Sequence, residues 1–205
     1  MSGRVSPSGE ALVAEAARLF VEEAHTDYGL AKRRAAERLG LSSRSGLPDN
    51  RQIEAAVLDY QRLFGGPRYT ARLKLLRDNA VRALRLLAPY GARLSGAVVS
   101  GAISDAHRVQ IHAFPEQAER VELFLHERGL DPEQDERDYR YGNGRVETVP
   151  LVRFEAGGVG LDVALFQPGQ ERHAPLSPVD GRPARRLTLA EAEALASTVV
   201  ETLLR

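Results

Sequence analysis

Residues 94–114, LSGAVVSGAISDAHRVQIHAF, contain the pattern that decides the predicted fold. An apolar run leads to a turn of small residues, and after a short polar loop the sequence alternates strictly between two kinds of side chain. Such alternation is typical of a half-buried β-strand, because successive side chains point to opposite faces of a sheet. One face holds Val109, Ile111 and Ala113, and the other holds Arg108, Gln110, His112 and Phe114. The polar face needs a functional explanation.

The sequence before this stretch has the period of amphipathic helices, and much of the sequence after it has the period of strands. Helices are predicted from about residue 7, over about 30–39, from about 48 to 64 and over about 69–87. Strands are predicted near 93–99 and 107–114, followed by a helix over 115–128, hairpins at Asn143-Gly144 and Gly157-Gly158, and a final helix from Thr188. We therefore predict an α+β protein, with a helical region (1–91) packed on a mixed sheet with flanking helices (92–205).

Composition limits the classes of protein that the sequence can encode. With 205 residues and 43% hydrophobic content the chain can bury a substantial core, and without cysteine it has neither disulfides nor thiolate metal sites. The first residues lack the apolar core of a signal peptide, and no run is long enough to span a membrane. We expect a cytoplasmic protein with no membrane partner.

The net charge is zero, but the two halves of the chain differ. Residues 1–93 contain 16 basic against 10 acidic side chains, and the remainder contains 12 against 18. Within the basic half, the predicted helix at 30–40 carries a cluster formed by Lys32, Arg33, Arg34 and Arg38. This cluster predicts binding to a nucleic-acid backbone, for which placed cations suffice. The alternative is an ordinary solvated helix face, since no aromatic residues interleave with the arginines.

Residues 90–167 resemble the nucleotidyltransferase fold of the DNA-polymerase-β superfamily. In that fold a Gly-Ser turn precedes an Asp-x-Asp strand, and a third acidic residue comes from a neighbouring strand. The segments TDYGLAKRRAAERLG, LPDNRQIEAAVLDYQRLF and VPLVRFEAGGVGLDVALFQP, at 26–40, 47–64 and 149–168, are also similar to a family of bacterial proteins labelled nucleotidyltransferase-like. This second resemblance implies no particular activity.

The first resemblance implies a site with a degenerate set of ligands. Nucleotidyl transfer uses two divalent ions, and Mg²⁺ requires carboxylate oxygens. Gln110 and His112 stand at the Asp-x-Asp positions, Ser100-Gly101 stands for the Gly-Ser turn in reversed order, and Asp162 fits the third acid. Two of the three anionic ligands are therefore missing, so no bound metal or other cofactor is expected.

Three functions remain open at this point. The first is a nucleotidyltransferase-like protein that has lost metal-dependent catalysis and binds a nucleotide, a nucleic acid or a protein. Its predicted cleft residues are Ser100, Gly101, Asp105, Gln110 and His112. The second is an active Mg²⁺-dependent enzyme with Asp162 as its catalytic residue, and the third is a basic helical module that binds nucleic acid. The nucleotidyltransferase interpretation requires Gln110 and Asp162 to share one face of a sheet.

Overall fold

The computed structural model describes residues 7–41 and 46–203, and the chain forms two compact units. The helical unit contains the chain up to Tyr69 together with Gly101–His107 and Pro178–Asp180. The sheet unit contains Thr70–Ser100, Arg108–Ser177 and the chain from Gly181 onward. These limits differ from the predicted boundary at residue 91, because most of the fourth long helix belongs to the sheet unit. The protein is α+β, with helices and one mixed five-stranded sheet.

Three helices make up most of the helical unit: α1 (Pro7–Glu22), α2 (Tyr28–Arg38) and α3 (Asn50–Tyr60). Asp27 begins α2, where its carboxylate accepts hydrogen bonds from the backbone N–H groups of Gly29 and Leu30. Asp49 begins α3 with a reciprocal capping box to Gln52. These side chains satisfy N–H groups that the first turn of each helix leaves unpaired, so both start points follow from local sequence.

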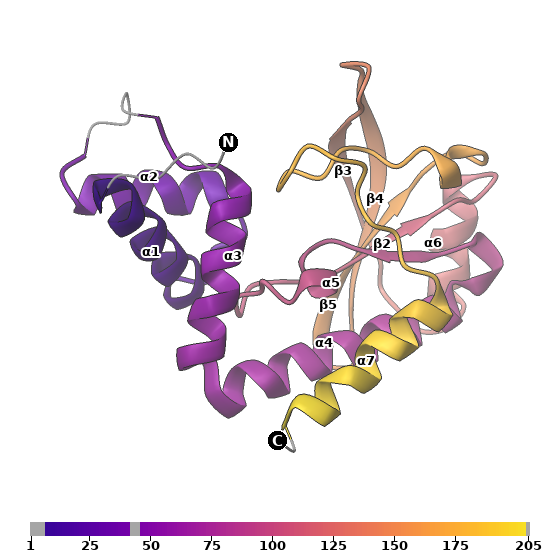
Figure 1. The fold of residues 1–205 in the computed structure, drawn as a ribbon. Helices are drawn as coiled ribbons and strands as arrows, with labels where there is room; N and C mark the ends of the chain where they lie inside the picture. The colour runs from indigo at the N-terminus through magenta and orange to yellow at the C-terminus, as the bar shows by residue number, and fades with distance from the viewer. Residues whose placement is uncertain (1–6, 42–45, 204–205) are drawn as a thin grey trace. The chain divides into compact units, whose positions relative to one another are not determined.

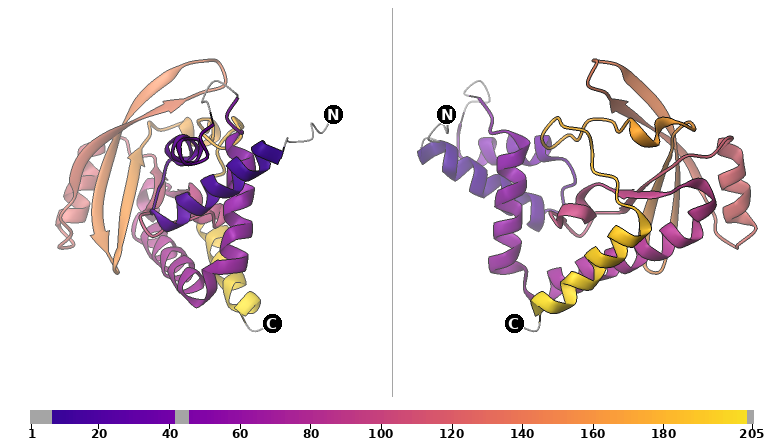
Figure 2. Two further views of the ribbon diagram at one scale, coloured as in Figure 1. Left: turned by 90° about the vertical axis from the view of Figure 1, so that its left-hand side faces the viewer. Right: turned by 45° about the vertical axis from the view of Figure 1, so that its right-hand side comes forward.

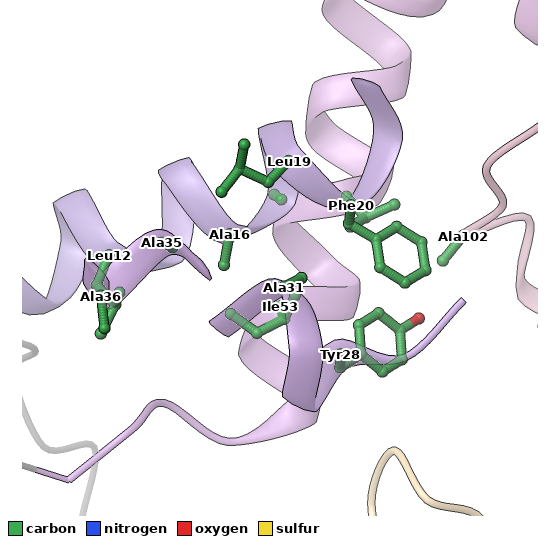
Figure 3. Packing of buried hydrophobic residues seen from close by; sticks show 12 residues of the cluster. Leu12, Ala16, Leu19, Phe20, Tyr28, Ala31, Ala35, Ala36, Ile53 and Ala102 are labelled. Atoms are coloured by element: carbon green, nitrogen blue, oxygen red, sulfur yellow. The ribbon is translucent and has the colours of Figure 1, made fainter. Parts of the chain in front are cut away.

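The core of the helical unit alternates small and large apolar side chains (Figure 3). Ala16 on α1 and Ala31 and Ala35 on α2 have no exposed surface and let the two helices approach closely. The rings of Phe20 and Tyr28 stack with their centroids 4.7 Å apart. The labelled core residues in Figure 3 are Leu12, Ala16, Leu19, Phe20, Tyr28, Ala31, Ala35, Ala36, Ile53 and Ala102.

A π-helical segment, η1 (Gln61–Gly65), follows α3 and changes which side chains are buried. The sequence pattern predicts Phe64 on the same side as Ile53 and Val57, but Phe64 is 69% exposed and Gln61 is buried in its place. The wider π turn rotates the face of the helix, and the amide Nε2 of Gln61 donates to the carbonyl of Ile103 at 2.8 Å. The prediction for Phe64 was therefore wrong.

The strands of the sheet are β1 (Arg93–Ser95), β2 (Val109–Ala113), β3 (Glu133–Arg140), β4 (Val146–Ala156) and β5 (Val159–Leu165). Their order is β1-β2-β5-β4-β3, and β2 with β5 is the parallel pair among otherwise antiparallel neighbours. Both predicted hairpins are confirmed, with the long β3–β4 hairpin extending from the sheet (Figures 1 and 2). Gly157 and Gly158 both have positive φ, which a two-residue hairpin loop favours.

Two long helices of the sheet unit, α4 (Gly66–Leu86) and α7 (Leu189–Leu203), lie side by side (Figure 1). Arg85 on α4 donates to Glu193 on α7 at 2.6 Å. Thr188 and Glu191 cap α7 as predicted, with the Thr188 backbone N–H donating to the Glu191 carboxylate at 2.7 Å. The shorter helices are η2 (Ala88–Tyr90), α5 (Ala97–Ser100), α6 (Ala118–His126) and η3 (Gln170–Arg172).

The strand predicted at 93–99 is shorter in the structure. It ends at Ser95, and α5 begins two residues later. Gly96 between them has a φ of +78°, and a Cβ atom at this position would collide with the side chain of Gln110. The chain therefore turns away from the sheet where Gln110 lies over the glycine backbone, a contact that the apolar run alone did not predict.

Candidate functional site

The centre of the candidate site is the parallel pair of strands β2 and β5. Gln110 pairs with Asp162 in the register, and His112 pairs with Ala164. Residues directly opposite on neighbouring strands point to the same face of a sheet, so the predicted placement of Gln110 beside Asp162 is confirmed. The alternate residues Val109 and Ile111 have no exposed surface. The sequence pattern thus separated the two faces correctly.

Asp162 accepts hydrogen bonds from two arginines and lies close to a third. Its Oδ1 accepts from Nε of Arg108 at 2.6 Å, and its Oδ2 accepts from Nη2 of Arg137 at 2.9 Å. Nε of Arg153, the register partner of Asp162 on β4, lies 3.6 Å from Oδ1. The Asp162 side chain is only 5% exposed, whereas the three arginines are 31–40% exposed. A nearly buried carboxylate is therefore surrounded by cations that reach solvent.

Two further carboxylates balance these arginines. Glu155 accepts from Nη1 of Arg108 at 2.5 Å, and Asp135 accepts from Nη1 of Arg153 at 2.7 Å. Arg108 also lies directly over Gly160, where a Cβ atom would collide with its guanidinium. Gly160 is thus needed for close approach rather than for a turn. The network, which we call the Asp162 cluster, contains three arginines and three acids: Arg108, Arg137, Arg153, Asp135, Glu155 and Asp162.

Sequence reasoning found Asp162 but missed its partners. The alternation placed Arg108 on the polar face of the predicted strand, but it did not indicate which acid Arg108 would contact. Arg137 and Arg153 lie in strands whose neighbours could not be known before the register was known. In the parts of the chain that the structure describes, no group of three or more His, Asp or Glu side chains is placed to hold a metal ion.

His112 lies on the same face but in a different environment. Its ring is almost fully buried, contacts Tyr139 and Phe166, and accepts at Nδ1 from Nε of Arg186 at 2.8 Å. Burial, reinforced by the charges of Arg186 and Arg137, lowers the pKa of His112 to about 3. The ring is therefore neutral at physiological pH, and its proton is assigned to Nε2 because Nδ1 accepts. His112 belongs to a buried aromatic cluster and does not line an open cleft, contrary to the prediction.

The remaining predicted cleft residues fall in different units. Ser100 ends α5 in the sheet unit, and its hydroxyl donates to the carbonyl of Ala97 at 3.3 Å. Gly101 and Asp105 belong to the helical unit, where Asp105 forms an ion pair with Arg68. Within the predicted set, the sheet register pairs only Gln110 with Asp162.

The basic cluster on α2 is partly neutralised within the helical unit. Nζ of Lys32 donates to the carbonyl of Pro48 at 3.0 Å and to Oδ1 of Asn50 at 2.7 Å. Arg38 forms an ion pair of 2.6 Å with Glu23. Arg33 and Arg34 are exposed, and neither makes an ion pair with residues 7–41 or 46–203. Of the four predicted phosphate contacts, these two arginines are the ones with no ion-pair partner in the part of the chain that the structure describes.

A serine and a histidine also meet in the helical unit. Oγ of Ser104 lies 2.9 Å from Nδ1 of His107, and both side chains are buried. The same hydroxyl is within hydrogen-bonding distance of the carbonyl of His25, and Nδ1 accepts from the Ser104 backbone N–H. These contacts close the turn between the two residues, so we assign the pair a structural role.

Comparison with known proteins finds no match: no protein-family model, no curated protein and no solved structure is similar to this chain. Over the described ranges, the helices are also too short or too polar to cross a membrane. The function must therefore be argued from the geometry of the sites themselves.

Proposed function

We propose that this chain is a nucleotidyltransferase-like protein that does not transfer nucleotides and instead binds an anionic partner. The observation that carries this proposal is the Asp162 cluster. The acid that fits the third ligand position has both carboxylate oxygens engaged by arginine N–H groups. Guanidinium groups thus take the place that divalent cations would need.

The charge and the lone pairs around Asp162 do not suit a divalent metal ion. Mg²⁺ needs several anionic oxygens in octahedral geometry and gives up its water reluctantly. To ligate Asp162, it would have to displace Arg108 or Arg137, and the displaced cations would then lie close to the metal. Gln110, the register partner of Asp162, contributes a neutral amide only. The balance of charge therefore disfavours a divalent ion in this cluster.

Three arginines that form no ion pair with a carboxylate among the described residues favour an anionic partner over other partners. Arg33 and Arg34 are exposed on α2, and Arg186 makes no ion pair among the described residues. Anionic groups such as phosphates satisfy such guanidiniums well, because the planar fork matches their oxygens. A nucleotide or a nucleic acid has this chemistry, and an acidic protein surface is the remaining alternative.

We expect the wild-type protein to transfer no nucleotide. Incubation with each labelled nucleoside triphosphate, Mg²⁺ or Mn²⁺, and protein or RNA acceptors should yield no labelled product. The melting temperature in MgCl₂ should equal that in KCl of the same ionic strength, because no preformed anionic site gains from the ion.

Labelled product that is lost in folded Asp162→Asn protein would overturn the proposal and establish an active enzyme. Circular dichroism and thermal unfolding of the variant must accompany this assay, because Asp162 also supports the fold. Labelling that persists in the variant would indicate another site, and Glu155→Gln is the control for altered charge on the same surface. The exposed carboxylate of Glu155 contacts Arg108, but Glu155 is not the register partner of Gln110.

A second candidate function is nucleic-acid binding through α2, favoured by the exposed pair Arg33 and Arg34. Binding to a generic RNA or DNA should weaken steeply as salt rises, because phosphate contacts release counterions. In Arg33→Gln/Arg34→Gln protein, the slope of log affinity against log salt should fall by about 2, roughly one for each lost contact. Fluorescence anisotropy measures both quantities.

The matched control for this test is Arg51→Gln on α3, which also removes an exposed arginine from the helical unit. It should leave the slope unchanged. Equal slopes for the double variant and the wild type, or the absence of binding at low ionic strength, would assign Arg33 and Arg34 to an ordinary solvated surface.

A further inference from the structure

Arg186 stands apart from the other arginines on this face of the sheet. It approaches the sheet from the segment 167–187, with its guanidinium over the rings of Phe166 and Phe114, 4.7 Å and 5.1 Å from their centroids. Nε donates to His112, and Nη1 donates to the carbonyl of Gln170 at 2.6 Å. Within residues 7–41 and 46–203 no carboxylate forms an ion pair with it. Its charge is therefore fixed in position, and the carboxylate of Glu171 acts on it without forming an ion pair.

Two buried polar atoms in this region lack a hydrogen-bond partner among the described residues. They are Nη2 of Arg186 and the hydroxyl oxygen of Tyr141. The Tyr141 side chain belongs to a residue that is only 8% exposed. Leaving buried polar groups unpaired is costly, and native proteins rarely do so without a functional reason.

Two chains of contacts bring Arg186 and Tyr141 into one neighbourhood. Tyr139, two residues before Tyr141, contacts both His112 and Phe166, the rings next to Arg186. The charge of Arg186 also acts directly on the Tyr141 hydroxyl. In the second series of contacts, the backbone carbonyl of Gln170 accepts from Arg186, and Nε2 of Gln170 donates to Glu147 at 3.1 Å. Glu147 is the register partner of Tyr139.

Both unpaired groups are hydrogen-bond donors. A guanidinium has no acceptor. Burial raises the pKa of Tyr141, and the carboxylate of Glu147 adds to the rise through its charge and through its contact with the hydroxyl, so the hydroxyl stays protonated. The Glu147 carboxylate is itself engaged, because it accepts from Nη2 of Arg145 at 2.7 Å as well as from Gln170. The Tyr141 hydroxyl forms no hydrogen bond of normal geometry with Glu147, so an acceptor is still missing. The charge of Arg186, which no described carboxylate pairs directly, favours a negative one.

We propose that Arg186 and Tyr141 together bind an oxyanion, the phosphate or carboxylate group of a small molecule. One anionic oxygen would accept from Nη2 and from the hydroxyl, while the bonds to His112 and Gln170 hold the guanidinium in place. This inference rests on one part of the proposed function, the binding of an anionic partner, and names the residues that would hold it. The loss of nucleotide transfer, which depends on the Asp162 cluster, is tested by a different experiment. The two proposals can therefore fail separately.

The test is calorimetric titration of the full chain with inorganic phosphate, adenosine monophosphate and acetate, in a buffer without other oxyanions. Binding of phosphate and the nucleotide but not acetate identifies a phosphate site, and binding of acetate identifies a carboxylate site. Arg186→Gln should weaken binding about 10- to 100-fold, as expected for a charge-assisted hydrogen bond. Tyr141→Phe should weaken it about 3- to 10-fold.

Tyr141→Phe is the variant that we expect to fold normally, because it removes one oxygen atom and keeps the ring on which Arg145 lies. Arg172→Gln is the matched control, since Arg172 is an exposed arginine of the same segment, and it should bind as the wild type does. No binding of any of the three anions to folded wild-type protein would overturn the inference. Equal binding by wild type, Arg186→Gln and Tyr141→Phe would overturn it as well, whatever the nucleotide-transfer assay shows.

Discussion

Asp162→Asn should destabilise the protein by about 2–4 kcal/mol, measured as the free energy of unfolding in urea. The substitution keeps the size of the side chain but removes the charge that Arg108, Arg137 and Arg153 share. Loss of one partner from a buried ion pair leaves the remaining charge uncompensated, which costs more than the pair itself contributes. The expected loss of stability is smaller than for a fully buried ion pair, because the arginines are about one-third exposed and water screens their charge.

Glu155→Gln is the control for this experiment. Glu155 contacts the same Arg108, but its side chain is 68% exposed, so the loss should be within about 1 kcal/mol. Similar values for the two variants would show that the Asp162 cluster is an ordinary surface network. That result would also remove the charge argument against Mg²⁺, because a weakly held carboxylate could change partners.

Stability should decline as the pH falls from about 6.5 towards 3, and His112 should account for part of the decline. Its pKa in the folded protein is lowered to about 3 by burial, whereas an unfolded histidine titrates near 6.5. Between these values the unfolded chain binds a proton that the folded protein does not, so acid favours unfolding. Stability from this group is thus present above pH 6.5 and is lost as the pH falls.

The slope from one such group is at most about 1.4 kcal/mol per pH unit. Urea unfolding of wild type and His112→Gln at several values between pH 4 and 7 measures it. Glutamine offers Arg186 an acceptor oxygen but does not titrate in this range, so its curve should be flatter than that of the wild type. Carboxylates titrate in both proteins, and the difference between the curves isolates the imidazole.

His173→Gln is the control, because it removes an exposed imidazole from the same unit. Parallel curves for wild type and His112→Gln would contradict the assignment of a buried, neutral His112. Direct observation of the His112 ring by NMR gives a second criterion: its resonances should not titrate between pH 5 and 8.

Local sequence alone determined the elements whose signals lie within a few residues. The capping pair Thr188 and Glu191 predicted the start of α7, and Asn143-Gly144 predicted the turn of the β3–β4 hairpin. Strict alternation around Gln110 predicted the buried apolar face of β2, although His112 on the other face is buried as well. Caps, tight turns and side-chain alternation depend on neighbours in the chain, so they need no knowledge of the tertiary fold.

Only the tertiary structure decided what the polar residues of the sheet do. Asp162 was expected beside Gln110, but its contacts with Arg137 and Arg153 depend on the order of β5, β4 and β3, which the sequence does not specify. The same holds for His112, whose neutral state results from burial beside Arg186, 74 residues away. Register and burial are properties of the folded chain as a whole, because charged and polar groups change their chemistry with neighbours that are distant in sequence.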